Sequence, residues 1–155
     1  MTGNRQILIL LAAAGSAALL LAAFGFQHLG GMAPCKLCLW QRWPHGAAIV
    51  FGVLALAIPG RIFVSLGLLS ALSTAAIGLY HTGVERKFWQ GPTSCTSGDI
   101  TGLSAQQLLE QIMTAPLARC DEVPWALFGL SMASWNAVLA LCLACLWALA
   151  ARERV

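Results

Sequence analysis

Charged residues are scarce in this chain of 155 residues. Only 10% of the residues are Asp, Glu, Lys or Arg, whereas 59% are hydrophobic. An ordinary soluble domain contains about 25% charged residues, so this chain has too little polar surface to cover a compact soluble fold. Its net charge of +3 is too small and too scattered for a nucleic-acid-binding protein. The composition therefore predicts an integral membrane protein with one domain.

Charge is absent altogether from long apolar runs such as residues 7–26 and 62–80. A helix of about 20 residues spans about 30 Å, the thickness of the hydrocarbon core of a bilayer. The first run is longer than the core of a signal peptide, and three further runs follow it, so we interpret it as a span. We predict an all-α fold, an integral membrane four-helix up-down bundle with transmembrane helices at about 7–26, 39–58, 62–80 and 125–150.

Basic residues set the predicted orientation of this bundle. Four arginines lie close to the two termini or in the short segment between the second and third runs: Arg5, Arg61, Arg152 and Arg154. The basic residues of the other side are spread widely and are matched by acidic residues. By the positive-inside rule, both termini are therefore expected in the cytoplasm. The loops at about 27–38 and 81–124 then lie outside, in an oxidising compartment.

Two cysteines open the second run, in the segment "PCKLCLWQR". Pro34 suits the first position of a helix, whose unpaired N–H groups and dipole would then face the sulfurs of Cys35 and Cys38. Arg42 lies four residues beyond Cys38, on the same helix face. Helix termini and cations both lower the pKa of a thiol. We therefore favour redox activity over a structural disulfide, which would be a weak staple across two residues, and over half of a zinc site.

A second Cys-x-x-Cys, Cys142 and Cys145, lies near the end of the last run. It is about 25–30 Å deeper along the fourth helix, on the opposite side of the bilayer from the first pair. The two pairs therefore cannot share a metal ion or exchange disulfides. The leucines around Cys142 and Cys145 offer no charge to stabilise a thiolate, so we expect both to pack as small hydrophobic residues in a core.

Cys95 and Cys120 lie in the long external loop, 25 residues apart. A disulfide between them would persist in an oxidising compartment. Their separation alone favours an ordinary loop staple, whereas the presence of Cys35 and Cys38 on the same side of the membrane favours a redox function. A zinc site from all four thiols is possible by count. The loop pair lacks the short spacing of zinc modules, however, so no metal site is predicted.

The same loop contains the segment "LSAQQLLEQIM", which we interpret as a short amphipathic helix. Ser104 and Gln107 form a capping-box pattern at its start. Glycines and a proline surround Cys95, which we therefore expect in a flexible, exposed stretch that an external partner can reach.

Taken together, these features resemble the DsbB family of disulfide-bond formation proteins. The segments "PCKLCLWQR", "YHTGVERKFWQGPTSC" and "RCDEVPWALFGLSMASWN" are all similar to that family's segments, so the likeness covers nearly the whole chain. The resemblance implies a bacterial inner-membrane thiol:quinone oxidoreductase that reoxidises a periplasmic thioredoxin-fold dithiol oxidase of the DsbA type. Its electrons would pass to a membrane quinone, ubiquinone or menaquinone, and so sustain disulfide bond formation in secreted proteins.

The resemblance also implies roles for single residues. Cys95 would form the mixed disulfide with the partner protein, and Cys120 would be its bridge mate. Cys35 and Cys38 would be the quinone-coupled pair. Cys142 and Cys145 have no role in the family. The residues of the quinone site would be Cys38, Arg42, His81 and Met132, the last two by a looser match.

Two other functions stay open at this point. A quinone reductase of the vitamin K epoxide reductase type would have the same arrangement of four helices and two thiol pairs. A non-enzymatic four-span scaffold would use the loop disulfide as a structural staple. Replacing Cys35 or Cys38 with Ala separates the scaffold from the enzymes, because a scaffold would keep its function.

Overall fold

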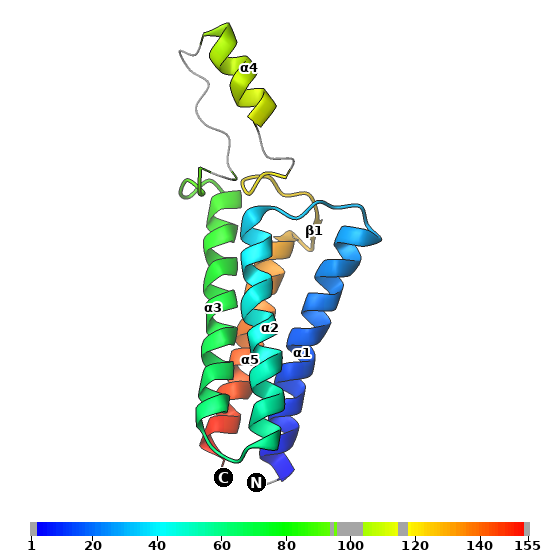
Figure 1. Ribbon diagram of the computed structural model, residues 1–155, viewed down its shortest axis with the longest axis vertical. Helices are drawn as coiled ribbons and strands as arrows, with labels where there is room; N and C mark the ends of the chain where they lie inside the picture. The colour runs from blue at the N-terminus through cyan, green and yellow to red at the C-terminus, as the bar shows by residue number, and fades with distance from the viewer. Residues whose placement is uncertain (1–2, 94, 96–103, 115–117, 154–155) are drawn as a thin grey trace.

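The computed structural model describes residues 3–93, 95, 104–114 and 118–153. Four long helices run side by side and alternate in direction, so both ends of the chain lie at the same end of the bundle (Figure 1). α3 packs against α2 and α5, and α1 packs against the same two helices. The four helices are α1 (Gly3–His28), α2 (Lys36–Ala57), α3 (Ile62–Glu85) and α5 (Met132–Arg152).

Three of these helices, α1, α3 and α5, are long and apolar enough to cross a membrane. Side chains such as Leu21 and Leu69 are exposed on their outer surfaces. Exposed leucines in long apolar helices are typical of surfaces that face lipid. α2 is equally long, but its first half carries the polar residues Gln41, Arg42 and His45.

Small residues bring the helices close together at the end of the bundle that holds the termini. Trp147 of α5 is fully buried there. A Cβ atom on Gly67 of α3 would lie 2.7 Å from the Trp147 ring, and a Cβ atom on Gly52 of α2 would lie 2.6 Å from Ala13. The close approach of these backbones therefore depends on glycine, as is usual where lipid-embedded helices pack through small residues.

The opposite end of the bundle carries the remaining elements. A short hairpin joins β1 (Ala126–Leu127) to β2 (Leu130–Ser131), and α4 (Ala105–Thr114) lies beyond the ends of the long helices (Figure 1). Ser104 and Gln107 form the reciprocal hydrogen bonds of a capping box at the start of α4.

The last long helix begins at Met132 rather than at 125, where the apolar run begins. Phe128 and Gly129 both have positive φ angles, of 52° and 76°. Two such residues in succession form the tight turn that a two-residue hairpin requires. Ser131 then caps α5 by accepting a hydrogen bond from the backbone N–H of Ser134 at 3.1 Å. The chain therefore turns once more before it enters the bundle.

Candidate functional site

The thiols of Cys35 and Cys38 lie together at the start of α2. Cys35 is the N-cap residue of this helix, and its sulfur accepts a hydrogen bond from the backbone N–H of Cys38 at 3.3 Å. Pro34 therefore precedes the cap instead of occupying the first turn. The Cys35 thiol donates to the sulfur of Cys38 at 2.9 Å.

The pKa of the Cys35 thiol is raised far above its ordinary value. The main cause is the hydrogen bond that Cys35 donates to Cys38, and burial of the side chain adds to it. Cys35 consequently keeps its proton, and any negative charge of the pair falls on Cys38. Cys35 is buried whereas Cys38 is only partly buried, and Cys38 lines the cavity beside Arg42, so Cys38 is the one placed to react with a molecule from outside.

A disulfide joins Cys95 to Cys120 and lies against this pair. Both loop cysteines are buried in one cluster with Cys35, Leu37 and Val84. The expectation that Cys95 lies in an exposed stretch is therefore wrong. Glycine and proline near a cysteine reveal the absence of regular structure but do not reveal which distant side chains cover it.

Ionic contacts hold the segment around Cys120 against the end of α3. The guanidinium of Arg119 donates to both carboxylate oxygens of Asp121, at 3.0 and 2.8 Å, and Lys87 donates to the same carboxylate at 2.6 Å. The hydrogen bonds from Arg119, with those from Lys87, hold the pKa of Asp121 well below its usual range. Lys87 follows α3 and Arg119 precedes Cys120, so these contacts tie the two parts of the chain together.

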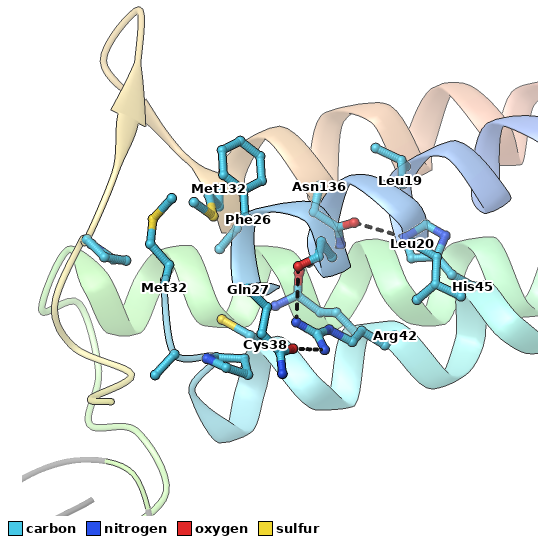
Figure 2. A pocket seen from close by; sticks show the side chains of 16 residues that line it. Leu19, Leu20, Phe26, Gln27, Met32, Cys38, Arg42, His45, Met132 and Asn136 are labelled. Carbon is cyan, nitrogen blue, oxygen red and sulfur yellow. Dashed lines mark hydrogen bonds between the residues drawn. The ribbon is translucent and has the colours of Figure 1, made fainter. Parts of the chain in front are cut away.

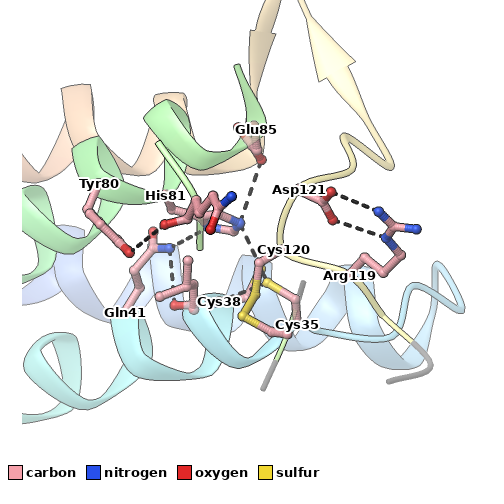
Figure 3. The surroundings of a disulfide bond; sticks show 12 residues. Cys35, Cys38, Gln41, Tyr80, His81, Glu85, Arg119, Cys120 and Asp121 are labelled. Atoms are coloured by element: carbon pink, nitrogen blue, oxygen red, sulfur yellow. Dashed lines mark hydrogen bonds and ion pairs between the residues drawn. A yellow bond between two sulfur atoms is a disulfide. The ribbon is translucent and has the colours of Figure 1, made fainter. Parts of the chain in front are cut away.

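His81 of α3 lies beside Cys35 (Figure 3). Its Nε2 atom is 3.6 Å from the Cys35 sulfur and 3.9 Å from a carboxylate oxygen of Glu85. Its Nδ1 atom is 3.1 Å from the side-chain amide of Gln41. A cavity of about 280 Å³ lies between the thiols and the loop that carries Cys120, and its lining includes Cys35, Cys38, His81, Glu85, Arg119 and Met132.

Arg42 points into a neighbouring cavity of about 120 Å³ between α1, α2 and α5 (Figure 2). Its guanidinium donates to the side chain of Gln27 at 2.6 Å and lies 4.9 Å from the centre of the Phe24 ring. The rest of the lining is mostly apolar, and it includes Cys38 and Met132. The structure therefore brings Cys38, Arg42 and Met132 to one cavity, whereas His81 lies in the adjoining one.

Two buried nitrogen atoms in the Arg42 cavity have no hydrogen-bond partner among the described residues. They are Nε of Arg42 and Nδ1 of His45. A buried polar atom without a partner costs free energy. The Arg42 Nε–H favours a ligand with an oxygen acceptor, whereas Nδ1 of His45, whose Nε2 faces the Asn136 oxygen, is itself an acceptor and favours a hydroxyl donor. The cavity shares Met132 and Asn136 with an apolar groove of about 340 Å³ beside the hairpin. A ring that carries oxygen atoms and an apolar tail therefore fits the residues present.

A polar network beneath the two cavities was not anticipated from the sequence. Asn136 of α5 donates to the side chain of Gln41 at 2.7 Å and to Thr74 at 3.1 Å, and its oxygen lies 2.9 Å from Nε2 of His45. The network joins α2, α3 and α5. Polar residues within apolar helices usually face the bundle interior and mark functional sites. That rule was the available signal for His45 and Asn136.

Cys142 and Cys145 lie elsewhere, on the outer surface of α5. Both thiols are free, and both side chains are exposed. The expectation that they pack in a core is wrong in this respect. The protein core at this level is filled by Leu143 and Ala144, the two residues between them.

Comparison with known proteins agrees with this arrangement. The family described as "Disulfide bond formation protein DsbB" matches residues 4–150 of the chain. Disulfide bond formation protein B 2 of Pseudomonas aeruginosa is 35% identical over 81% of this chain and 77% of its own length. Disulfide bond formation protein B of Stutzerimonas stutzeri is 27% identical over 94% of this chain and 95% of its own length. The chain therefore belongs to the DsbB family, whose members are disulfide-forming oxidoreductases of membranes.

Proposed function

We propose that this protein reoxidises the dithiol of a periplasmic thioredoxin-fold oxidase of the DsbA type and passes the two electrons to a membrane quinone. The observation that carries the proposal is the contact between the two thiol pairs. The Cys95–Cys120 disulfide packs against Cys35, and Cys38 opens toward the Arg42 cavity. Electrons entering at the loop therefore have a short path to a lipid-side acceptor.

The proposal includes a fourth span, formed by α2, in the bacterial inner membrane. The polar side chains of α2 do not oppose this, because Gln41 and His45 are buried inside the bundle and Arg42 faces a cavity. We further propose that both termini are cytoplasmic, because arginines are dense in the short segments near them. The loop carrying Cys95 and Cys120 is then periplasmic.

The proposed electron transfer consists of two disulfide exchanges, followed by oxidation of the inner thiol pair. The partner's two thiols exchange with the Cys95–Cys120 disulfide, giving an oxidised partner and two loop thiols. These thiols exchange with a Cys35–Cys38 disulfide, so the loop bridge forms again and the inner pair is reduced. Two electrons and two protons leave Cys35 and Cys38 when their own disulfide closes. The arrangement described above, a loop bridge beside two inner thiols, corresponds to the stage after the second exchange.

A quinone bound in the Arg42 cavity would supply the final oxidant, since a DsbA-type disulfide at about −120 mV needs a still stronger one. The chain's own residues would do the rest. Cys35 holds the shared proton, which leaves Cys38 as the nucleophile. The unpartnered Nε–H of Arg42 is placed to donate to a ring oxygen of the quinone, and Nδ1 of His45 is placed to accept from a hydroxyl of the reduced ring. His81 lies beside Cys35, and its Nε2–H is placed to stabilise the Cys35 sulfur when the proton leaves.

The test is turnover by the purified full-length protein in lipid nanodiscs. The donor is a reduced periplasmic thioredoxin-fold oxidase, and short-chain ubiquinone and menaquinone are compared as acceptors. We expect one quinone reduced for each donor disulfide formed. Folded protein that oxidises the donor without reducing quinone, or that has no activity with either acceptor, would contradict the proposal.

A further inference from the structure

Three metal-binding side chains converge at the point where the thiol pair meets α3. Ligand atoms of Cys35, Cys38 and His81 all lie within 4.8 Å of one another. We propose that the reduced protein binds one thiophilic divalent cation, Zn²⁺ or Cd²⁺, through these three residues. This inference goes beyond the proposed function, because the site needs no quinone and no partner protein.

The distances suit a tetrahedral site with small adjustments. With Zn–S bonds of about 2.3 Å and Zn–N bonds of about 2.0–2.1 Å, tetrahedral geometry places sulfur and nitrogen about 3.5 Å apart. The sulfur of Cys35 lies 3.6 Å from Nε2 of His81. The two sulfurs, now 2.9 Å apart because one donates to the other, must separate to about 3.8 Å. Loss of the shared proton removes the hydrogen bond that draws them together.

Glu85 lies beside His81, at the edge of the three-residue group. One of its carboxylate oxygens lies 3.9 Å from Nε2 of His81. The other oxygen accepts a hydrogen bond from Ser131, which holds the carboxylate in this orientation. The amide nitrogen of Gln41 lies 3.1 Å from Nδ1 of His81. A cation on Nε2 requires the proton on Nδ1, so on metal binding the Gln41 amide turns its oxygen toward the ring. Such supporting hydrogen bonds orient the ligands in most protein metal sites.

Charge and access both suit a cation. Two thiolates neutralise the charge of a divalent ion, so its burial carries no uncompensated charge. The cavity of about 280 Å³ beside these residues is lined by the carboxyl groups of Glu85 and Glu122, and it provides a route of entry. Binding releases the two thiol protons and changes no oxidation state.

The site exists only while Cys35 and Cys38 are reduced. A Cys35–Cys38 disulfide has no thiolate left to bind a metal ion. Conversely, a bound cation occupies both sulfurs and prevents their disulfide from closing. A thiophilic cation therefore traps the inner pair in its reduced form.

The experiment measures metal binding by the full-length chain in nanodiscs. The other cysteines are first replaced by alanine, so that the two inner thiols are the only ones left: Cys95→Ala, Cys120→Ala, Cys142→Ala and Cys145→Ala. Cd²⁺ is titrated into this protein, reduced and then oxidised, and the cadmium–thiolate absorption is followed. We expect one Cd²⁺ per reduced chain and no binding to the oxidised chain.

Variants test whether His81 is a ligand. His81→Ala is expected to weaken Cd²⁺ binding by about 10- to 100-fold or more. His45→Ala is the matched control, because His45 is also a buried histidine but pairs with Asn136, and it should leave the affinity unchanged. Circular dichroism verifies that each variant is folded.

X-ray absorption of the Zn²⁺-loaded unsubstituted site provides a measurement that does not depend on these histidine variants. We expect two sulfur ligands and an imidazole nitrogen. A zinc shell with two sulfurs and no imidazole, equal affinity in His81→Ala, or no binding by the reduced protein would each overturn the inference. None of these outcomes depends on turnover, so failure here is distinct from failure of the proposed function.

Discussion

The chain contains the same motif twice, and the two copies lie in opposite surroundings. Cys35 and Cys38 cap the start of α2, share a proton, and contact a histidine and a disulfide. Cys142 and Cys145 lie in the middle of α5, exposed on the outside of the bundle. Spacing places two sulfurs on one side of a helix in either case. Reactivity depends on what surrounds the sulfurs.

Helix position accounts for much of this difference. A thiol at an N-cap receives backbone N–H groups that have no other partner, as Cys35 does from Cys38. Within a helix the backbone N–H groups already donate to carbonyl groups one turn earlier. Cys142 and Cys145 therefore receive no such stabilisation. A cysteine pair at a helix start is a stronger indication of redox chemistry than the spacing alone.

Removing one thiol from each pair gives the largest expected contrast. Cys38→Ala should lower donor-dependent quinone reduction by about 10³-fold or more, because no inner disulfide can form. Cys145→Ala should change turnover less than about twofold, since its side chain lies on the outer surface. Stopped-flow measurement of quinone absorption checks both. Equal losses in the two variants would show that the outer pair also takes part.

The second-largest expected effect concerns Arg42, which lies one turn beyond Cys38 and so belongs to the surroundings of the first cysteine pair. Arg42→Met keeps an unbranched apolar stem and removes the charge and the donors of the side chain. We expect kcat/KM for quinone to fall by about 10²-fold, the usual effect of losing one donor to a developing negative charge. The rate of disulfide exchange between the donor and the Cys95–Cys120 bridge should stay unchanged in single-turnover experiments. A loss confined to that exchange step would contradict the assigned position of the quinone.

Local and periodic features of the sequence predicted the fold well. The apolar runs correspond to the four long helices, and three of them qualify as spans by length and composition. The start of α5 differed from the prediction, because the hairpin before this helix depends on the positive φ angles of Phe128 and Gly129. That segment is as apolar as the helix that follows. Hydropathy alone therefore does not separate the two.

Contacts between distant segments were harder to predict. Cys95 is buried in one cluster with Leu37 of α2 and Val84 of α3. The network of Gln41, His45 and Asn136 likewise needs three helices in a particular rotation. The sequence marked these residues only as polar positions in apolar helices. Which of them meet depends on packing that spacing does not encode.

Alkylation of the reduced protein gives a smaller contrast, this time within the first pair. The pKa of Cys35 is raised and its side chain is buried. Its thiolate fraction should therefore stay low well above the ordinary thiol pKa of about 8.5. With iodoacetamide at pH 7, Cys38 should react at least about 10-fold faster than Cys35. Peptide mass spectrometry at increasing pH checks this, and comparable modification of both thiols would contradict it.

The smallest expected effect concerns the ionic contacts that hold the loop disulfide against Cys35 and Cys38. Cys142 and Cys145 have no such disulfide beside them among the described residues. Asp121→Asn removes the carboxylate that binds both Arg119 and Lys87. Because the pKa of Asp121 is lowered in the folded protein, its stabilisation is present above the unfolded pKa of about 3.9 and is lost as pH falls below that value.

Lys87 is 64% exposed and Arg119 is 35% exposed, so water and salt weaken these contacts. The loss in free energy of unfolding should not exceed about 1 kcal/mol at pH 7. Thermal unfolding of Asp121→Asn and of the unsubstituted protein should therefore differ at pH 7 and converge below about pH 4. Glu122→Gln is the control, because Glu122 pairs with Arg119 and, among the described residues, not with Lys87, and it is itself 64% exposed. A difference that grew toward acid pH would mean that repulsion within the loop, rather than attraction to Asp121, sets the position of Cys120.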